Sequence, residues 1–286
     1  MTRADLNEIA LACQAKHAGL GAFNVVQLET AEAIVRAATL ADLPVVLQIS
    51  ENAAKYHGAL APLGRAVIEI AREAPVPVIV HLDHAESVEL IHEAVDLGFD
   101  SVMFDGSRLT YRQNESTTAQ VVRHCHDHGV AVEAELGEIG GKNGVHDPTT
   151  RTNPQEASTF IERTGADLLA VAVGSSHAMT TSDAVLDIEL IAAIRAAVPV
   201  PLVLHGSSGA NDATIQLAIN AGITKVNVST RLNRVFTTAI SHMIADHPEI
   251  TDPRTYFQAG NTRVRDEVAY LLRLYAKGEL APAGQF

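Results

Sequence analysis

The sequence predicts an α/β protein in which eight strand–helix units close into one (β/α)8 TIM barrel. Short, β-rich apolar runs alternate with stretches of helical periodicity, and eight such runs in 286 residues suit a single barrel. An open, doubly wound sheet is the alternative. A dinucleotide-binding sheet of that kind usually has a glycine-rich turn after its first strand, and no such turn follows the first run here.

The eight apolar runs mark the expected strands. In chain order they span residues 22–26, 44–49, 77–82, 101–104, 131–134, 168–173, 201–204 and 225–228. Apolar residues recur at helical spacing from Glu29 to about Leu40, and helical segments separate most of the other neighbouring runs. From about Pro253 to Phe286 the pattern predicts a helix and an end that contains proline and glycine. We interpret this segment as a helical appendage of a single domain spanning residues 1–286.

The junction between a helix and the next strand repeats one small pattern three times. Gly98, Gly165 and Gly222 each stand just before an expected strand. Glycine readily adopts the left-handed conformation that ends a helix. We therefore expect a helix to stop at each of these positions, in three similar units of one barrel.

The overall charge excludes two classes of partner. With 34 acidic and 21 basic residues the formal net charge is −13, which repels nucleic acid and anionic membranes but still allows a local anion-binding pocket. No apolar run approaches the roughly 18 residues of a membrane helix, and the N-terminus does not resemble a signal peptide. Two cysteines, Cys13 and Cys125, cannot form a disulfide framework. We expect a cytoplasmic protein whose partner is a small molecule.

Nearly every expected strand ends in a residue that can do chemistry, at the end of a barrel where active sites lie. Going along the chain, these residues are Asn24, Ser50, Asp83, His84, Asp105, Glu135, His177, His205 and Asn227. Histidines after strands three, six and seven would meet at one face, and three imidazoles with one open position form a catalytic zinc site. His81 and His84 both qualify as the ligand from strand three. Their spacing alone does not decide, since His81 shares a face with Asp83 and His84 begins the loop.

Two further groups of polar residues have more than one interpretation. Asp105 and Glu135 are either salt-bridge partners or the ligands of a second or transient metal position. The turns at 206–209 and 227–230 follow strands seven and eight, where barrels often bind phosphate through backbone N–H groups. The alternative is that both segments are ordinary turns between a strand and a helix.

Several longer motifs are shared with one family. They are Gly21–Asn24, His81–His84, Asp105–Ser107, the segment Val132–Gly137, the pair Gly140–Gly141, the segment Pro201–Gly209 and Lys225–Val228. Together they resemble the class II, metal-dependent ketose-bisphosphate aldolases, which act on fructose and tagatose bisphosphates. The resemblance covers nearly the whole chain, and the combination is far more specific than any one motif.

The resemblance implies a role for each matching residue. His84, His177 and His205 match the zinc ligands, which favours His84 over His81. Asp83 matches the acid/base that exchanges a proton with the C4 oxygen of the ketose. The remaining matches are Asp105 and Glu135 for an alternative metal position, Asn24 and Ser50 for the substrate pocket, and Gly206, Ser207, Ser208, Asn227, Ser229 and Thr230 for the phosphate and dihydroxyacetone moiety. As a side-chain amide, Asn227 can also donate a hydrogen bond to the charge that develops on the C2 oxygen during cleavage.

The implied activity is reversible retro-aldol cleavage of a phosphorylated ketose to dihydroxyacetone phosphate, or an analogue, and an aldehyde. The implied cofactor is Zn²⁺, with another divalent metal, or an additional monovalent cation, as alternatives. Relatives of this kind form homodimers or homotetramers. A different metal-dependent barrel activity and a non-catalytic sugar-phosphate-binding protein are the competing hypotheses.

Three departures from the family pattern bear on the substrate. Asn143 stands where the family has a proton-transferring glutamate, so His146 or Asp147 is a candidate loop acid/base. Ala178 replaces a glycine beside His177, and Arg231 replaces an acidic residue after strand eight. An added cation there favours a different anionic head group, such as that of a sulfonated sugar phosphate.

Overall fold

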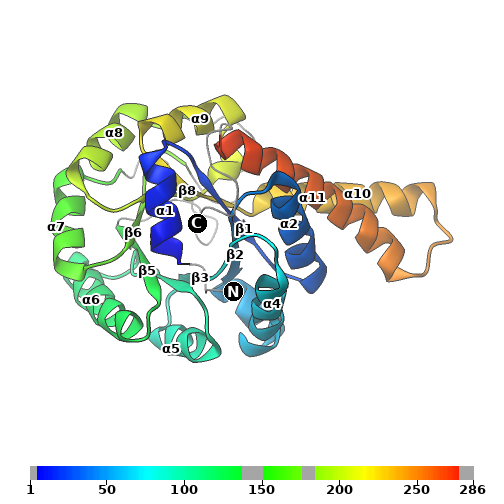
Figure 1. Cartoon of the computed structure of the whole chain (residues 1–286), viewed down its shortest axis with the longest axis horizontal. Coiled ribbons are helices and arrows are strands. Elements are labelled where there is room, and N and C mark those ends of the chain that lie inside the picture. Colours follow the sequence, from blue (N-terminus) through cyan, green and yellow to red (C-terminus); the bar gives the residue numbers. More distant parts are fainter. Residues whose placement is uncertain (1–4, 137–150, 176–183, 277–286) are drawn as a thin grey trace.

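The computed structural model describes residues 5–136, 151–175 and 184–276. Eight parallel strands form a closed barrel in the order β1 to β8, and β8 pairs again with β1 (Figure 1). Helices surround this barrel on the outside. The predicted (β/α)8 architecture is therefore confirmed.

The strands and helices alternate along the chain. The strands are β1 (Leu20–Asn24), β2 (Val45–Ser50), β3 (Val78–Ala85), β4 (Ser101–Phe104), β5 (Ala131–Leu136), β6 (Leu168–Val171), β7 (Leu202–Leu204) and β8 (Ile223–Val228). The α-helices are α1 (Leu6–Ala15), α2 (Leu28–Ala41), α3 (Glu51–His57), α4 (Ala61–Glu73), α5 (Val88–Leu97), α6 (Tyr111–Asp127), α7 (Pro154–Thr164), α8 (Ile188–Ala197), α9 (Asp212–Ala221), α10 (Thr230–Asp246) and α11 (Pro253–Ala276), and the short 3₁₀ helix η2 spans Ser207–Gly209.

Each predicted strand exists, but some bounds differ. β1 begins at Leu20 because Leu20 and Gly21 already pair with β8, although glycine has little intrinsic preference for strands. β3 continues to Ala85, past the expected end at residue 82, through an irregular register against β4. The first helix, α1, follows no strand and was not predicted.

The three glycine junctions are confirmed as helix ends. Gly98 and Gly165 follow α5 and α7 in the left-handed conformation, with φ of 93° and 71°. Gly222 follows α9 with φ of 132°, where a Cβ would meet the side chain of Arg195 at 2.6 Å. At each junction the chain reverses direction at a residue for which positive φ carries little strain.

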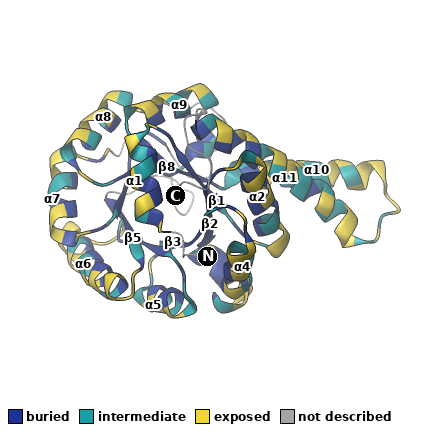
Figure 2. Ribbon diagram, viewed as in Figure 1, coloured by how far each residue is buried: buried dark blue, intermediate teal, exposed yellow. Residues whose placement is uncertain are grey.

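The barrel separates two hydrophobic cores. Outward-facing strand residues such as Leu47 and Val80 pack against the surrounding helices in the larger core. Inward-facing residues such as Ile79 and Met103 form a smaller core together with α1, which lies across the barrel (Figure 1). The strands are buried on both faces, whereas the helices are exposed on their outer sides (Figure 2).

The last two helices extend beyond the barrel as a hairpin (Figure 1). In its second half, α11 packs beside α2, and its buried residues Val268, Leu271 and Leu272 belong to the larger core. In its first half, Gly260 approaches Phe236 of α10 so closely that a Cβ would lie 2.6 Å from the ring. Within residues 5–136, 151–175 and 184–276, no helix has both the length and the apolar character that crossing a membrane requires.

Candidate active site

The barrel interior changes character along its axis. Side chains alternate along each strand, so Ile79, His81 and Asp83 of β3 all point inward. Near the amino ends of the strands the inward residues are apolar. Towards the carboxyl ends most of them are polar, and most of these are buried: Asn24, Gln48, His81, Asp83, Asp105, Glu133, Glu135, His205, Lys225 and Asn227. This polar end is the candidate active site.

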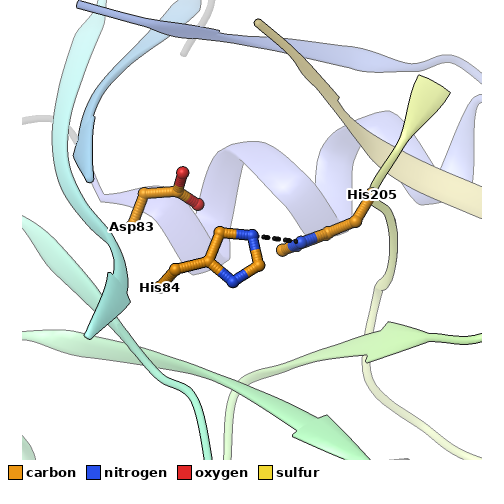
Figure 3. A group of neighbouring side chains, drawn as sticks. All are labelled: Asp83, His84 and His205. Atoms are coloured by element: carbon orange, nitrogen blue, oxygen red, sulfur yellow. Dashed lines mark hydrogen bonds between the residues drawn. The ribbon is translucent and has the colours of Figure 1, made fainter. Parts of the chain in front are cut away.

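A local distortion brings His84 into this site. Regular alternation would place His84 on the outer face of β3, opposite Asp83. Instead, His84 has a φ of 49°, which non-glycine residues rarely adopt, and the register with β4 shifts between Leu82 and Ala85. As a result, Asp83 and His84 approach His205 together (Figure 3). Such strain is typical of functional positions.

Two imidazoles face each other across the site. Nε2 of His84 lies 2.9 Å from Nδ1 of His205 (Figure 3). On their far sides, His84 Nδ1 lies 2.8 Å from Asp105 Oδ2, and His205 Nε2 lies 2.8 Å from Glu133 Oε1. Because a carboxylate only accepts, each of these outer nitrogens carries the proton, and in the neutral rings both inner nitrogens present lone pairs.

This donor set fits a divalent metal. Metal-binding histidines commonly donate their second N–H to a carboxylate, and two nitrogens on one tetrahedral zinc ion lie roughly 3.3 Å apart. Ligand atoms of Asp83, His84 and His205 lie within 4.8 Å of one another, as do those of His84, Asp105 and Glu135. The second group contains both carboxylates expected at an alternative metal position.

A proton occupies the same place when the protein is free of metal. Burial lowers the pKa of His84, but Asp83, Asp105 and Glu135 together outweigh it and raise the pKa to about 9. A protonated Nε2 then donates to His205 Nδ1. A metal ion must therefore displace this proton.

Asp83 is oriented by two amides. Asn24 Nδ2 donates to Asp83 Oδ2 at 2.9 Å, and Asn227 Nδ2 makes a longer contact with Asp83 Oδ1 at 3.4 Å. Asp83 itself is only 3% exposed. The predicted acid/base, the pocket residue Asn24 and the predicted donor Asn227 thus form one connected group beside the two imidazoles.

The other predicted residues lie around this group. Ser50 caps α3 by accepting from the backbone N–H of Ala53 at 3.1 Å. Gly206, with φ of 64°, precedes η2, where the Ser207 hydroxyl donates to the Asn227 carbonyl. Ser229 and Thr230 are the cap and first residue of α10.

Arg231 does not present a free cation. Its Nη1 and Nε pair with Asp212 and Glu267, both at 2.6 Å, and its backbone N–H donates to Ser208 Oγ in the neighbouring loop. The suggested effect of its charge on the substrate head group therefore lacks support from the side chain. His177, His146, Asp147, Asn143 and Ala178 lie outside the described residues.

The sequence did not reveal a role for three buried polar residues of the site: Gln48, Glu133 and Lys225. Each occurs two residues before a recognised residue on the same strand. Side chains two residues apart on a strand point to the same side, so these residues could have been predicted to face the barrel interior. A polar residue there needs a buried partner, which would have linked it to the site.

The barrel and its polar end are compatible with an aldolase, and comparison with known proteins identifies the family. The family model for fructose-bisphosphate aldolase class-II matches residues 4–279. The chain therefore belongs to the class II fructose-bisphosphate aldolase family, whose members are aldehyde-lyases and are generally metal-dependent.

Solved structures give the same result. The YdjI aldolase from Escherichia coli K12 is 32% identical, with a TM-score of 0.87 over 98% of this chain and 100% of that chain. A protein assigned as a fructose-1,6-biphosphate aldolase from Coccidioides immitis is 28% identical, with a TM-score of 0.87 over 100% of both chains. Fructose-bisphosphate aldolase from Campylobacter jejuni, 22% identical with a TM-score of 0.78 over 96% of both chains, shares the fold.

Proposed function

We propose that this protein is a zinc-dependent aldolase that reversibly cleaves a phosphorylated ketose to dihydroxyacetone phosphate, or an analogue, and an aldehyde. The observation that carries the proposal is the pair of facing imidazole nitrogens, 2.9 Å apart, beside the buried Asp83. A metal-binding pair and a carboxylate close to it, with ligand atoms within 4.8 Å of one another, are the two groups that class II aldol chemistry requires.

The chain's own residues supply the proton transfer. Asp83 accepts the proton of the C4 hydroxyl as the C3–C4 bond breaks, and returns it in the condensation direction. Cleavage leaves negative charge at C3 that is delocalised onto the C2 oxygen, and a divalent metal, when bound, supplies a Lewis acid for that charge. His84 and His205 would hold the metal, with His177 as the third ligand. Asn227 Nδ2 donates a hydrogen bond to the same developing charge.

The phosphate is proposed to bind at the ends of β7 and β8. Gly206 to Ser208 form a tight turn beside the start of α10, where the first backbone N–H groups of the helix attract an anion. The hydrogen bond from the Arg231 backbone to Ser208 Oγ joins the two segments. This arrangement supports recognition by backbone N–H groups, with Ser229 and Thr230 at the helix end and Asn24 and Ser50 lining the pocket.

The substrate need not be a standard bisphosphate. Asn143 and Ala178 change the loop chemistry and one phosphate corner of the family pattern, while Asp83, His84, His177 and His205 are retained. We therefore propose a non-standard anionic ketose, such as a sulfonated sugar phosphate, as the alternative substrate. His146 and Asp147 remain the candidate acid/base residues of the altered loop.

The proposal extends to the assembly and the location of the protein. All of α10 is described, and Leu232 is its one fully buried residue. The apolar stripe of this helix continues through the half-buried Ile240 and Met243 to the exposed Ile244. This projecting surface supports a homodimer or homotetramer, and light scattering of the purified protein would give the number of subunits. The acidic charge and the two unpaired cysteines support a cytoplasmic location.

Cleavage of fructose 1,6-bisphosphate and tagatose 1,6-bisphosphate by zinc-reconstituted protein, in a coupled assay for triose phosphate, tests the activity. We expect turnover that disappears on chelation and falls by about 10²–10⁴ in Asp83→Ala. Asp127→Asn, an exposed carboxylate at the end of α6, serves as the control and should keep full activity. Turnover that survives in Asp83→Ala would refute the role of Asp83. Tight metal binding without cleavage of either bisphosphate would favour the non-standard ketose.

A further inference from the structure

We propose that Lys225 is a positioning residue that sets the direction of the hydrogen-bond chain ending on Asp83. The inference rests on the proposed aldolase function, because its consequence for catalysis acts through Asp83. Lys225 itself is fully buried on β8, beneath the site, and needs no contact with the substrate.

Lys225 uses all three of its N–H groups inside the barrel. Nζ donates to Gln48 Oε1 at 3.0 Å, to Glu133 Oε2 at 2.9 Å and to Asn227 Oδ1 at 2.8 Å. An ammonium group donates hydrogen bonds and never accepts one. Its neighbours must therefore all turn oxygen atoms towards it, and this requirement removes the freedom that a buried amide otherwise has to rotate.

One arm of the chain reaches Asp83 through two amides. Because Gln48 directs Oε1 at Lys225, its Nε2 points the other way and donates to Asn24 Oδ1 at 3.0 Å. Asn24 then directs Nδ2 at Asp83 Oδ2, at 2.9 Å. In every hydrogen bond of this arm, the donor is the group nearer to Lys225 and the acceptor is the group nearer to Asp83.

The second arm is shorter. Asn227 directs Oδ1 at Lys225, so its Nδ2 faces Asp83 Oδ1 at 3.4 Å. The two arms meet at Asp83, where the first ends at Oδ2 and the second at Oδ1. Reversing either amide would place a carbonyl oxygen against the carboxylate, and the repulsion would move Asp83 away from the position it needs for proton transfer.

Packing alone does not explain a lysine here. A buried ion pair such as Lys225–Glu133 is seldom more stabilising than apolar residues of the same volume, because both charges lose their hydration. Glu133 balances the charge and also holds His205 Nε2. The ammonium thus provides directionality, which an apolar residue cannot provide.

Neutron diffraction from a deuterated crystal of the metal-free protein tests the directions without any assay. Nuclear scattering distinguishes an amide ND₂ from a carbonyl oxygen, which X-ray diffraction at ordinary resolution does not. We expect Lys225 as ND₃⁺, with the ND₂ groups of Asn24 and Asn227 towards Asp83. Either amide with its oxygen towards Asp83 would overturn the proposal. So would a neutral Lys225.

Steady-state kinetics test the consequence, with variants of similar shape. We expect Lys225→Met to lower kcat by about 10–100-fold with KM changed less than about threefold, and Gln48→Met to lower kcat less because it breaks one arm. In an Asn24→Ala background, Gln48→Met should have no further effect on kcat, since its arm acts only through Asn24. Met103→Ala, a core truncation on β4 in the apolar cluster, controls for lost stability and should keep kcat.

The outcomes separate the two proposals. Two results would show that the hydrogen-bond chain has a purely structural role. One is that Gln48→Met and Asn24→Ala lower kcat multiplicatively when combined. The other is that Lys225→Met and Met103→Ala lower kcat equally. If the wild-type protein cleaves no ketose phosphate, the proposed function fails, and the neutron structure still decides whether Lys225 sets the amide directions.

Discussion

The two ends of the barrel interior both contain fully buried residues but are built from opposite kinds of side chain. At the amino end, Ile79 and Met103 pack with α1 residues such as Leu6 and Ile9 in an apolar cluster. Towards the carboxyl end, Glu133 and Lys225 are equally inaccessible to solvent. The amino end is held together by hydrophobic contacts, which have no preferred direction. The carboxyl end is held together by hydrogen bonds, which require each donor to face an acceptor.

This difference indicates a division of labour within one set of strands. The apolar end and the outer core stabilise the barrel in proportion to buried area. The polar end adds little net stability, because its groups lose hydration when they are buried. It instead holds Asp83, His84 and His205 in fixed orientations. Substitutions at the two ends should therefore separate stability from activity.

The largest expected effect comes from breaking the ion pair at the polar end. Glu133→Leu leaves the ammonium of Lys225 and the Nε2 of His205 without their shared acceptor. We expect the free energy of unfolding in urea to fall by about 3–5 kcal/mol, since one buried charge loses its partner. The variant Glu133→Leu/Lys225→Met removes both charges and should recover much of that loss. A double variant no more stable than Glu133→Leu would contradict this account.

The comparison also shows which features the sequence could reveal. The existence of the eight strands and the glycine junctions was predictable because apolar runs and Gly98 or Gly165 encode them locally. Asp83, Asp105 and His205 were identified because chemistry in a barrel gathers at one end. These signals depend on neighbouring residues in the chain and on a known architecture.

Other features depend on contacts between distant residues. The left-handed backbone at His84 is imposed by the irregular pairing with β4, and a histidine gives no local sign of it. Lys225 and Glu133 are far apart in sequence and meet only when the barrel closes. The ion pairs of Arg231 could not be predicted, because its partners Asp212 and Glu267 lie on two other helices.

A smaller effect should appear on acidification, through His81. Burial, the charges of Lys225 and the nearby imidazoles lower the pKa of His81 well below its usual range, against the opposing effect of Glu133. In the unfolded chain His81 takes up a proton near pH 6.5, whereas in the fold it stays neutral. Stability is therefore unaffected above that pH and is lost as the pH falls below it, by at most about 1.4 kcal/mol per pH unit from this residue.

Urea titrations between pH 5 and 8 isolate this contribution when His81→Asn is compared with the wild type. Asparagine can still bond Ser101 Oγ, which lies 2.8 Å from His81 Nδ1, and it does not titrate. The difference in stability between the two proteins should change in favour of the variant below about pH 6.5. Parallel stability curves across that range would show that His81 takes up its proton at the same pH in the fold as in the unfolded chain, and would contradict the lowered pKa.

The smallest effect is expected at the apolar end, four residues before Asp83 on the same strand. Ile79→Val removes one methylene from the fully buried core beneath the site and should cost about 0.5–1.5 kcal/mol in the free energy of unfolding. Its kcat should equal that of the wild type, because no hydrogen bond to Asp83 passes through Ile79. His81, between the two on the inward face, makes its one side-chain hydrogen bond within the described residues to Ser101 and so does not transmit the change. A fall in kcat for Ile79→Val comparable to that of Gln48→Met would show that the two ends are mechanically coupled, and that activity depends on the packing of the whole barrel interior.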